Sequence, residues 1–200
     1  MMNNLEKKHP TIGCCGIDCG LCPRYYTEGK SRCPGCLGPK FLEIMGQTCS
    51  FISCCVKNKN LETCGECRDF PCSKFDSEWF GKDSYDSFVT HKKAIPNLTF
   101  IKNKGFVEFI KQQEIRMKIL KEMLDKFNDK RSKSYFCLAS ALLPVYLLEK
   151  SLDSAKKIVE KLGIGKDDIK AKAKILREIL QDAADKENIK LKLQKPPNWK

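Results

Sequence analysis

Hydrophobic positions repeat at helical spacing in the second half of the chain. From Gly105 onward they recur at steps of three and four residues, which is the period of an amphipathic α-helix. The pattern predicts helices over about 105–128, 134–143, 152–162 and 167–187. Pro144 either ends the second of these helices or opens the next one at its first position, where its missing N–H does no harm. We therefore expect residues 105–188 to form an all-α helical domain.

The first half has a different pattern, because residues 14–75 contain no long hydrophobic run. They are rich in Cys, Gly and Pro instead. Such a segment buries too little apolar surface to offset the entropy lost on folding, and bound metal is the usual substitute in small domains. We expect a small metal-stabilised domain that resembles a zinc ribbon or knuckle and has little regular structure.

Three further segments complete the predicted organisation, namely a leader over 1–13, a connector over 76–104 and a tail over 189–200. The connector is not a free linker in this interpretation. It carries four aromatic residues that we expect to pack against a neighbouring part of the chain: Trp79, Phe80, Tyr85 and Phe88.

Cysteine is the unusual component of the composition, with 13 residues in a chain of 200. The N-terminus has no apolar run behind its lysines, so no signal peptide is expected. The longest apolar segment, FCLASALLPVYLL, is too short to cross a membrane and contains Pro144. We expect a soluble, cytoplasmic protein with no membrane contact. In that reducing compartment clustered cysteines are more often metal ligands than disulfides.

The net charge of +12 is unevenly distributed along the chain. Residues 1–80 have a balance of +1, whereas residues 81–200 have a balance of +11. A basic half permits contact with nucleic acid or with acidic partners. Its densest basic group comprises Lys130, Arg131 and Lys133. Two aromatic residues that could stack on bases, Tyr135 and Phe136, follow this group. The interspersed Glu and Asp favour a solvated helix surface over a nucleic-acid interface.

The spacing of the cysteines indicates metal binding. Three pairs have two intervening residues, a spacing with which a tight turn aims both sulfurs at one ion: Cys19/Cys22, Cys33/Cys36 and Cys64/Cys67. Tetrahedral zinc takes four such ligands, so two zinc ions are expected. One site would use Cys19, Cys22, Cys33 and Cys36, and the other Cys49, Cys54, Cys64 and Cys67. Cys15 and Cys72 would be spare or would replace a member of either set, and spacing leaves the pairing open.

An iron–sulfur cluster is the alternative. Cys15, Cys19 and Cys22 have the C-x3-C-x2-C spacing found in radical S-adenosylmethionine enzymes, but the strand–helix alternation of those enzymes is absent here. A cluster held by four cysteines is also compatible with the sequence. The paired C-x2-C turns favour zinc. Asp18 lies inside the first block and is interpreted as a turn former or as an acceptor beside the metal site.

Four blocks of the sequence carry a family resemblance: CGIDCGLCP at 15–23, CPGC at 33–36, CSFISC at 49–54 and CGECRDFPCSKF at 64–75. They resemble a cysteine-rich bacterial and archaeal family of unknown function, whose members carry CGxDCxxCPxY, CxGC, CxxxxC and CxxCxxxPC blocks. The resemblance implies metal binding and no particular reaction. Carried over residue by residue, it selects ten ligands: Cys15, Cys19, Cys22, Cys33, Cys36, Cys49, Cys54, Cys64, Cys67 and Cys72.

The resemblance leaves out Cys14, Cys55 and Cys137. The spacing of the cysteines also excludes these three from the predicted metal ligands. Cys14 and Cys55 adjoin better-placed ligands, and adjacent side chains rarely reach the same ion. Cys137 lies in an apolar helical pattern and is interpreted as a small buried hydrophobic residue.

The sequence thus supports three hypotheses of function. The first is a zinc-binding module on a helical scaffold that interacts with an unknown protein partner. The second is an iron–sulfur or thiol-dependent enzyme of redox or sulfur chemistry, and the third is nucleic-acid binding through the basic half. The sequence has no Ser/His/Asp or Cys/His arrangement and no glycine-rich phosphate loop, so it assigns no reaction.

Overall fold

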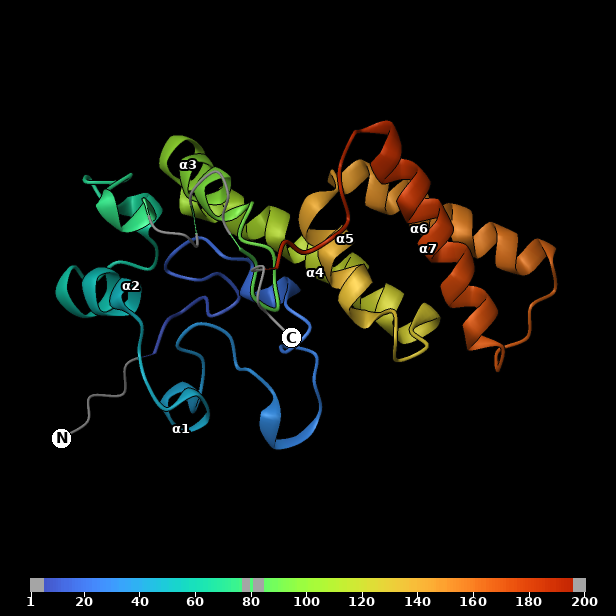
Figure 1. Ribbon diagram of the computed structural model, residues 1–200, viewed down its shortest axis with the longest axis horizontal. Helices are drawn as coiled ribbons and strands as arrows, with labels where there is room; N and C mark the ends of the chain where they lie inside the picture. The colour runs from blue at the N-terminus through green and yellow to red at the C-terminus, as the bar shows by residue number, and fades with distance from the viewer. Residues whose placement is uncertain (1–5, 77–79, 81–84, 196–200) are drawn as a thin grey trace. The chain divides into compact units, whose positions relative to one another are not determined.

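The computed structural model describes residues 6–76, 80 and 85–195 (Figure 1). This part of the chain contains α-helices, 3-10 turns and one π-helical turn, and no strand. It divides into two compact units. The first unit comprises Met1–Gln112 with Leu193–Lys200, and the second comprises Gln113–Lys192. No helix in the described residues is long and apolar enough to span a bilayer.

The first unit has little regular structure before residue 94, as the sequence predicts. Its elements are short: η1 (Cys19–Leu21), η2 (Gly29–Ser31), α1 (Phe41–Met45), α2 (Ser50–Ile52), the π-helical turn η3 (Ser53–Asn58), η4 (Cys64–Glu66) and η5 (Ser73–Phe75). Nearly every cysteine-bearing segment is therefore a turn or a single helical turn, and tertiary contacts must fix its position.

Helix α3 (Ala94–Lys104) provides those contacts, although its residues lie in the predicted connector. Pro96 occupies its first turn, where backbone N–H groups have no partner within the helix, so the proline does not break it. Leu98 and Ile101 are buried in the core of the first unit. The helix packs against η4.

The core of the first unit combines ordinary apolar side chains with cysteines. Its buried members are Ile12, Leu37, Phe70, Phe75, Leu98, Ile101 and Phe109 together with Cys14, Cys36, Cys55 and Cys64. Ile12 is buried and so is Lys7, so the end of the predicted leader belongs to this unit. Phe80 of the predicted connector packs against Phe51 and Phe75, whereas Trp79 lies outside the described residues.

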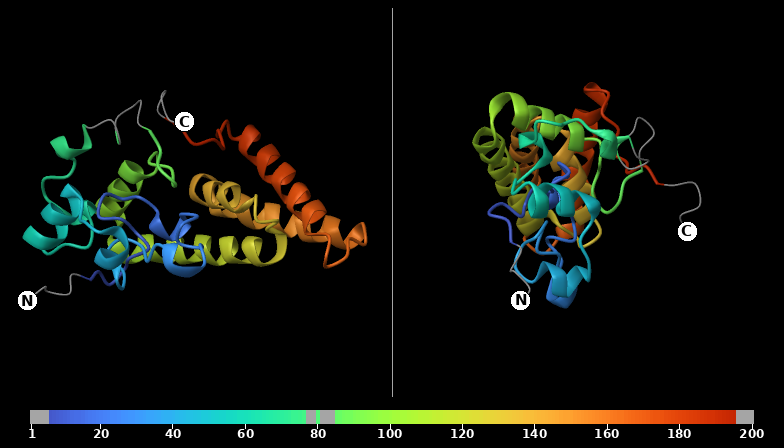
Figure 2. Two further views of the ribbon diagram at one scale, coloured as in Figure 1. Left: turned by 60° about the horizontal axis from the view of Figure 1, so that its bottom comes forward. Right: turned by 90° about the vertical axis from the view of Figure 1, so that its left-hand side faces the viewer.

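The predicted helices of the second half are confirmed. They are α4 (Phe106–Phe127), which begins in the first unit, α5 (Lys133–Leu142), α6 (Val145–Lys161) and α7 (Ile169–Lys186). Helix α6 begins earlier than its predicted start at residue 152, because Pro144 serves as its N-cap. Helices α6 and α7 pack against each other (Figures 1 and 2). Cys137 is buried in α5, as expected.

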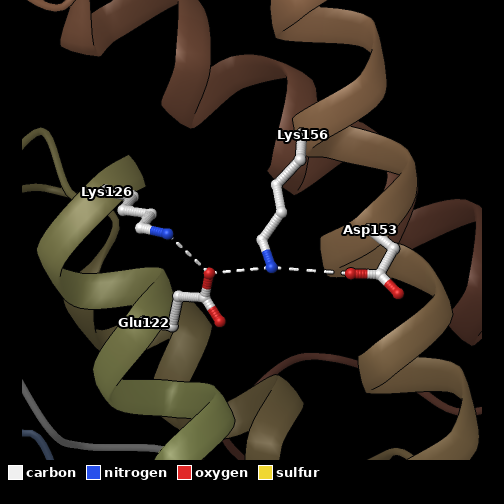
Figure 3. Close-up of polar contacts among 4 residues, drawn as sticks. All are labelled: Glu122, Lys126, Asp153 and Lys156. Carbon is white, nitrogen blue, oxygen red and sulfur yellow. Dashed lines mark hydrogen bonds and ion pairs between the residues drawn. The ribbon is translucent and has the colours of Figure 1, made fainter.

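Helices α4 and α6 are also joined by a small charge network (Figure 3). The Glu122 carboxylate accepts hydrogen bonds from Lys126 Nζ at 2.8 Å and from Lys156 Nζ at 2.7 Å. The Lys156 ammonium also lies 3.5 Å from an Asp153 oxygen. The two lysines lower the pKa of Glu122, since they stabilise its charged form.

Replacing this carboxylate gives a pH-dependent loss of stability. We expect Glu122→Gln to lower the free energy of unfolding by about 0.5 kcal/mol at pH 7, the scale of a solvent-screened ion pair. A depressed folded-state pKa stabilises the fold above the unfolded pKa of about 4.3, and this contribution disappears as the pH falls through the folded value. Urea denaturation at pH 7 and at pH 3 measures the difference, which should shrink at the lower pH.

The control for that experiment is Glu178→Gln in α7, where a single Lys174 partner lies 3.9 Å away. The control should lose less stability than Glu122→Gln. A loss for Glu122→Gln that stays constant down to pH 3 would contradict the ionic origin of the effect.

Candidate metal centre

Helix α3 fixes the turn that carries Cys15 and Cys19. Asn97 Nδ2 donates hydrogen bonds to the Gly16 carbonyl at 2.9 Å and to an Asp18 carboxylate oxygen at 3.0 Å, and all three groups are buried. Gly16 has a φ of +86° and approaches the helix so closely that a Cβ there would lie 2.3 Å from the Ala94 carbonyl oxygen. Asp18 is thus an acceptor that ties this turn to α3.

The same helix supports the turn of Cys64 and Cys67. A Cβ on Gly65 would lie 2.8 Å from the Leu98 carbonyl oxygen. Thr63 and Glu66 form a capping box around this turn, in which the Thr63 N–H donates to Glu66 Oε2 at 2.8 Å. The Cys64 N–H donates to the Cys14 carbonyl at 2.8 Å. Two cysteine turns that are far apart in the sequence are therefore joined backbone to backbone.

The third C-x2-C turn, of Cys33 and Cys36, is held by the end of the leader. The Cys36 N–H donates to the Pro10 carbonyl at 2.8 Å, and a Cβ on Gly35 would lie 2.3 Å from the same oxygen. Leu37, the next residue, is buried with a φ of +56°. A branched side chain rarely adopts this left-handed conformation, so the turn is held in a strained geometry by its surroundings.

These contacts bring four buried thiols into a row. The Sγ atoms of Cys14 and Cys36 lie 3.6 Å apart. Cys55 and Cys64 are buried in the same core cluster, where the Cys55 thiol donates a hydrogen bond to the Leu61 carbonyl at 3.4 Å. We call Cys36, Cys14, Cys55 and Cys64 the thiol row. Cys14 and Cys55 are its most buried members, with exposed fractions of 1% and 2%.

The first predicted ligand set also forms a neighbourhood. Cys19 lies within electrostatic range of Cys36, Cys15 and Cys22, and Cys22 lies within range of Cys33. The second predicted set is more dispersed. Cys64 belongs to the thiol row, Cys49 is exposed, and Cys67 accepts a hydrogen bond from Lys59 Nζ at 3.1 Å. Cys54 and Cys72 are half-buried in η3 and just before η5.

All 13 cysteines lie among the described residues, and all are free thiols. Within that part of the chain, no three His, Cys, Asp or Glu side chains converge in an arrangement that could hold an ion as they stand. The thiol contacts are pairwise. The donor chemistry is nevertheless that of soft metal sites, because sulfur ligands select zinc, copper(I) or iron–sulfur clusters.

Burial makes several of the thiols weaker acids. Desolvation raises the pKa of Cys15 to about 12 and also raises the pKa values of Cys19 and Cys22. The hydrogen bond with Cys14, followed by burial, raises the pKa of Cys36. These four thiols therefore hold their protons more tightly than an exposed cysteine does, and a cation that binds them must displace the protons.

Lys7 places a positive charge beside these thiols. Its side chain is buried, and Nζ donates a hydrogen bond to the Ile12 carbonyl at 2.7 Å. The ammonium favours the thiolate forms of Cys14 and Cys36, because it opposes the increase in their pKa values. A cationic group near sulfur ligands also suits a four-thiolate zinc site, whose net charge is −2.

The cysteine-rich region matches a family model. Residues 11–77 match the family described as "Protein of unknown function (DUF3795)". This match confirms the resemblance found in the four cysteine blocks. The DUF3795 region contains all the members of the thiol row and ends before α3. No curated protein and no solved structure matches the chain.

Cys14, Cys55 and Lys7 are the residues that sequence reasoning passed over. Each of the two cysteines belongs to a doublet, Cys14-Cys15 or Cys54-Cys55. In both doublets one sulfur faces the core while its neighbour is only half-buried. The doublet itself was the available signal, because adjacent side chains point in different directions and can serve two different groups of ligands.

Tyr135 and Phe136, the aromatic residues predicted to be available for stacking on bases, make contacts within the second unit. Phe136 is fully buried and so cannot stack on a base. The Arg177 guanidinium covers the Tyr135 ring at 4.8 Å from its centroid, and the Tyr135 hydroxyl donates to Gln181 at 3.0 Å. Nucleic-acid binding remains a prediction, but it would have to use the lysines without these two rings.

The buried amide of Asn97 can be tested by a single-atom change. Asn97→Asp removes the donor to Asp18 and places a second carboxylate against it. We expect a loss of about 3 kcal/mol of stability at pH 7, because two buried like charges repel each other. The loss of stability should become smaller as the pH falls, because one of the two carboxyl groups takes up a proton. Urea denaturation of the full chain at pH 7 and pH 4 measures both effects.

Asn103→Asp is the matched control, since Asn103 is exposed on the same helix. It should change stability by no more than about 0.5 kcal/mol. Equal losses for the two variants would show that Asn97 has no special role in holding the cysteine turn.

Proposed function

We propose that the cysteine-rich part of the first unit is a metal-binding module whose thiolates hold zinc. The observation that carries this proposal is the thiol row, in which four free cysteines from four separate segments meet in the core. Its segments are otherwise short turns with few apolar side chains of their own. A shared metal ion would join them and contribute to folding directly.

The same arrangement favours a structural role for the metal. Four protein thiolates fill the tetrahedral coordination of zinc and leave no position for a substrate or an activated water. The module then acts by presenting a surface to another protein. Helix α1 offers one such surface with three exposed apolar side chains, Leu42, Ile44 and Met45.

An iron–sulfur centre is the second candidate, and the neighbourhood of Cys19 favours it. Cys15, Cys19 and Cys22 share one loop, and Cys36 lies within electrostatic range of Cys15 and Cys19. Four cysteines near one another can ligate such a cluster. This alternative would give the protein an electron-transfer or sulfur-handling activity.

Metal analysis of the full chain, purified without oxygen, tests these proposals. We expect a colourless protein that contains zinc. A brown protein that contains iron and sulfide and absorbs near 400 nm would replace the zinc proposal with the iron–sulfur one. A protein that contains neither metal, and takes up neither after reduction, would overturn the metal-binding function.

A further inference from the structure

We propose that a surface patch of the first unit binds single-stranded nucleic acid by stacking bases on aromatic rings and arginine side chains. Its four members lie in the loop of residues 22–33 and in the segment that precedes α3: Arg24, Tyr25, Arg32 and Phe88. We call them the arginine–aromatic patch. The inference goes beyond the proposed metal-binding function and does not depend on it, because none of these side chains is a metal ligand.

Two arginine–aromatic pairs form the patch. The Arg24 guanidinium carbon lies 5.3 Å from the centroid of the Phe88 ring. The Arg32 guanidinium carbon lies 5.6 Å from the centroid of the Tyr25 ring. Both separations are those of cation–π contacts. Because Arg24 and Tyr25 are adjacent in the sequence, the two pairs share one short segment of backbone.

The exposure of these side chains makes them available to a ligand. Phe88 is 55% exposed even though the Arg24 guanidinium covers part of its ring. Arg32 is exposed, and Tyr25 is half-buried. Nucleic-acid bases stack on aromatic rings and also on the planes of arginine guanidinium groups. The patch therefore offers flat groups of both kinds at the protein surface.

Hydrogen bonds hold the loop of the patch in place. The Cys33 N–H donates to the Arg24 carbonyl at 3.0 Å, and the Tyr25 N–H donates to the Cys22 carbonyl at 2.9 Å. Arg32 Nε donates to the Tyr25 carbonyl at 3.2 Å, so the guanidinium beside the Tyr25 ring is itself fixed. A surface that is ordered before binding loses less conformational entropy when a ligand binds to it.

The charge around the patch suits a phosphate backbone. The loop of residues 22–33 has three basic residues and one acidic residue, and the basic residues are Arg24, Lys30 and Arg32. Lys195 Nζ donates to the Ser87 carbonyl at 2.9 Å, which places another ammonium beside Phe88. The cations attract phosphates while the rings bind bases. An acidic peptide would pair with the cations but would leave the exposed rings uncovered, so nucleic acid is the better match.

A single strand fits this patch better than a duplex does. The bases of a duplex are stacked on one another, so their faces are not open to protein rings. Readout of a duplex uses an α-helix or a β-ribbon in the major groove. Among the described residues of this loop, the longest regular elements are the single turns η1 and η2 at its two parts, and neither is long enough to enter a groove. Stacking of this kind tolerates many sequences, because every base has an aromatic face.

Fluorescence anisotropy of the full chain tests the proposal, with a labelled pyrimidine strand of about 12 nucleotides as the probe. We expect the single strand to bind several-fold more tightly than the same strand annealed to its complement, and the affinity to fall as salt is added. Binding of either the DNA or the RNA version supports the proposal, and their comparison identifies the preferred one. No binding of either version at low salt, or equal affinity for strand and duplex, would overturn it.

Variants of Phe88 locate the binding surface. Phe88→Ala should weaken binding about tenfold, the loss expected when one base no longer stacks on a ring. Phe88→Trp should retain binding, because it keeps an aromatic ring at the same place. The matched control is Tyr146→Ala, since Tyr146 is 58% exposed on α6 in the second unit. It should bind the probe as tightly as the unmodified chain.

Two further outcomes would overturn the proposal. Unchanged affinity in Phe88→Ala would mean that the strand binds elsewhere, through lysines alone. Displacement of the probe by a polyglutamate peptide as effectively as by unlabelled strand would mean that the patch recognises negative charge only, as an acidic protein partner supplies it. Circular dichroism of each variant confirms that it is folded, which is expected because Phe88 and Tyr146 are both largely exposed.

Discussion

Removal of the metal by a chelator is expected to unfold the cysteine-rich part of the first unit while the second unit keeps its helices. Structural zinc contributes on the order of 10 kcal/mol in small thiolate domains, which is comparable to the whole stability of a typical domain. The segments that carry the thiols are short turns with little regular structure of their own. Hydrogen exchange should therefore show loss of amide protection around residues 11–75, with protection retained in α5, α6 and α7.

Circular dichroism gives an independent measurement of the same change. Most of the α-helix lies in α4 to α7, so the helical signal should fall only slightly after chelation. Addition of zinc under reducing conditions should restore the lost protection. Metal-free protein that keeps its amide protection across the cysteine turns would show that the metal is not needed for folding.

The sequence predicts the helices of the second half well because their stability depends on one apolar face. Ala173, Leu176 and Leu180 of α7 recur at helical spacing, and all three are buried. The sequence did not predict helix α3, because the stability of this helix depends on tertiary contacts. Its short apolar pattern contains Pro96 and follows a polar connector, and its burial depends on the cysteine turns that pack against it.

In the candidate metal centre, the spacing of the cysteines predicts the individual turns but not which sulfurs from different turns meet. Spacing predicts that Cys33 and Cys36 share a tight turn, and the close approach of Gly35 to Pro10 shows how that turn is fixed. Which sulfurs meet across different turns depends on the path of the whole chain. The contact between Cys14 and Cys36 depends on how Pro10 and α3 hold their turns, and no local spacing rule contains these contacts.

Substitution of Gly16 by alanine is expected to be the most damaging single methyl addition in the first cysteine turn. The new Cβ would lie 2.3 Å from the Ala94 carbonyl oxygen and 2.7 Å from Leu98 Cγ, and both atoms belong to α3. The backbone φ of +86° adds strain for any residue with a Cβ. Together, overpacking and the unfavourable φ should cost about 3 kcal/mol or more. Urea denaturation of the metal-loaded chain measures the loss.

Gly29→Ala separates the two causes of that loss. Gly29 also has a positive φ, of +77°, but a Cβ there would meet no atom within 4 Å. Gly29→Ala should therefore lower the free energy of unfolding by only about 1 kcal/mol, which is the contribution of the backbone conformation alone. The excess cost of Gly16→Ala then measures how tightly the first cysteine turn is packed on α3. Because this turn also positions Cys14 and Cys15, Gly16→Ala should bind metal more weakly, whereas Gly29→Ala should bind it normally. Equal losses of stability in the two variants would mean that the contact between this turn and α3 does not hold the metal ligands in place.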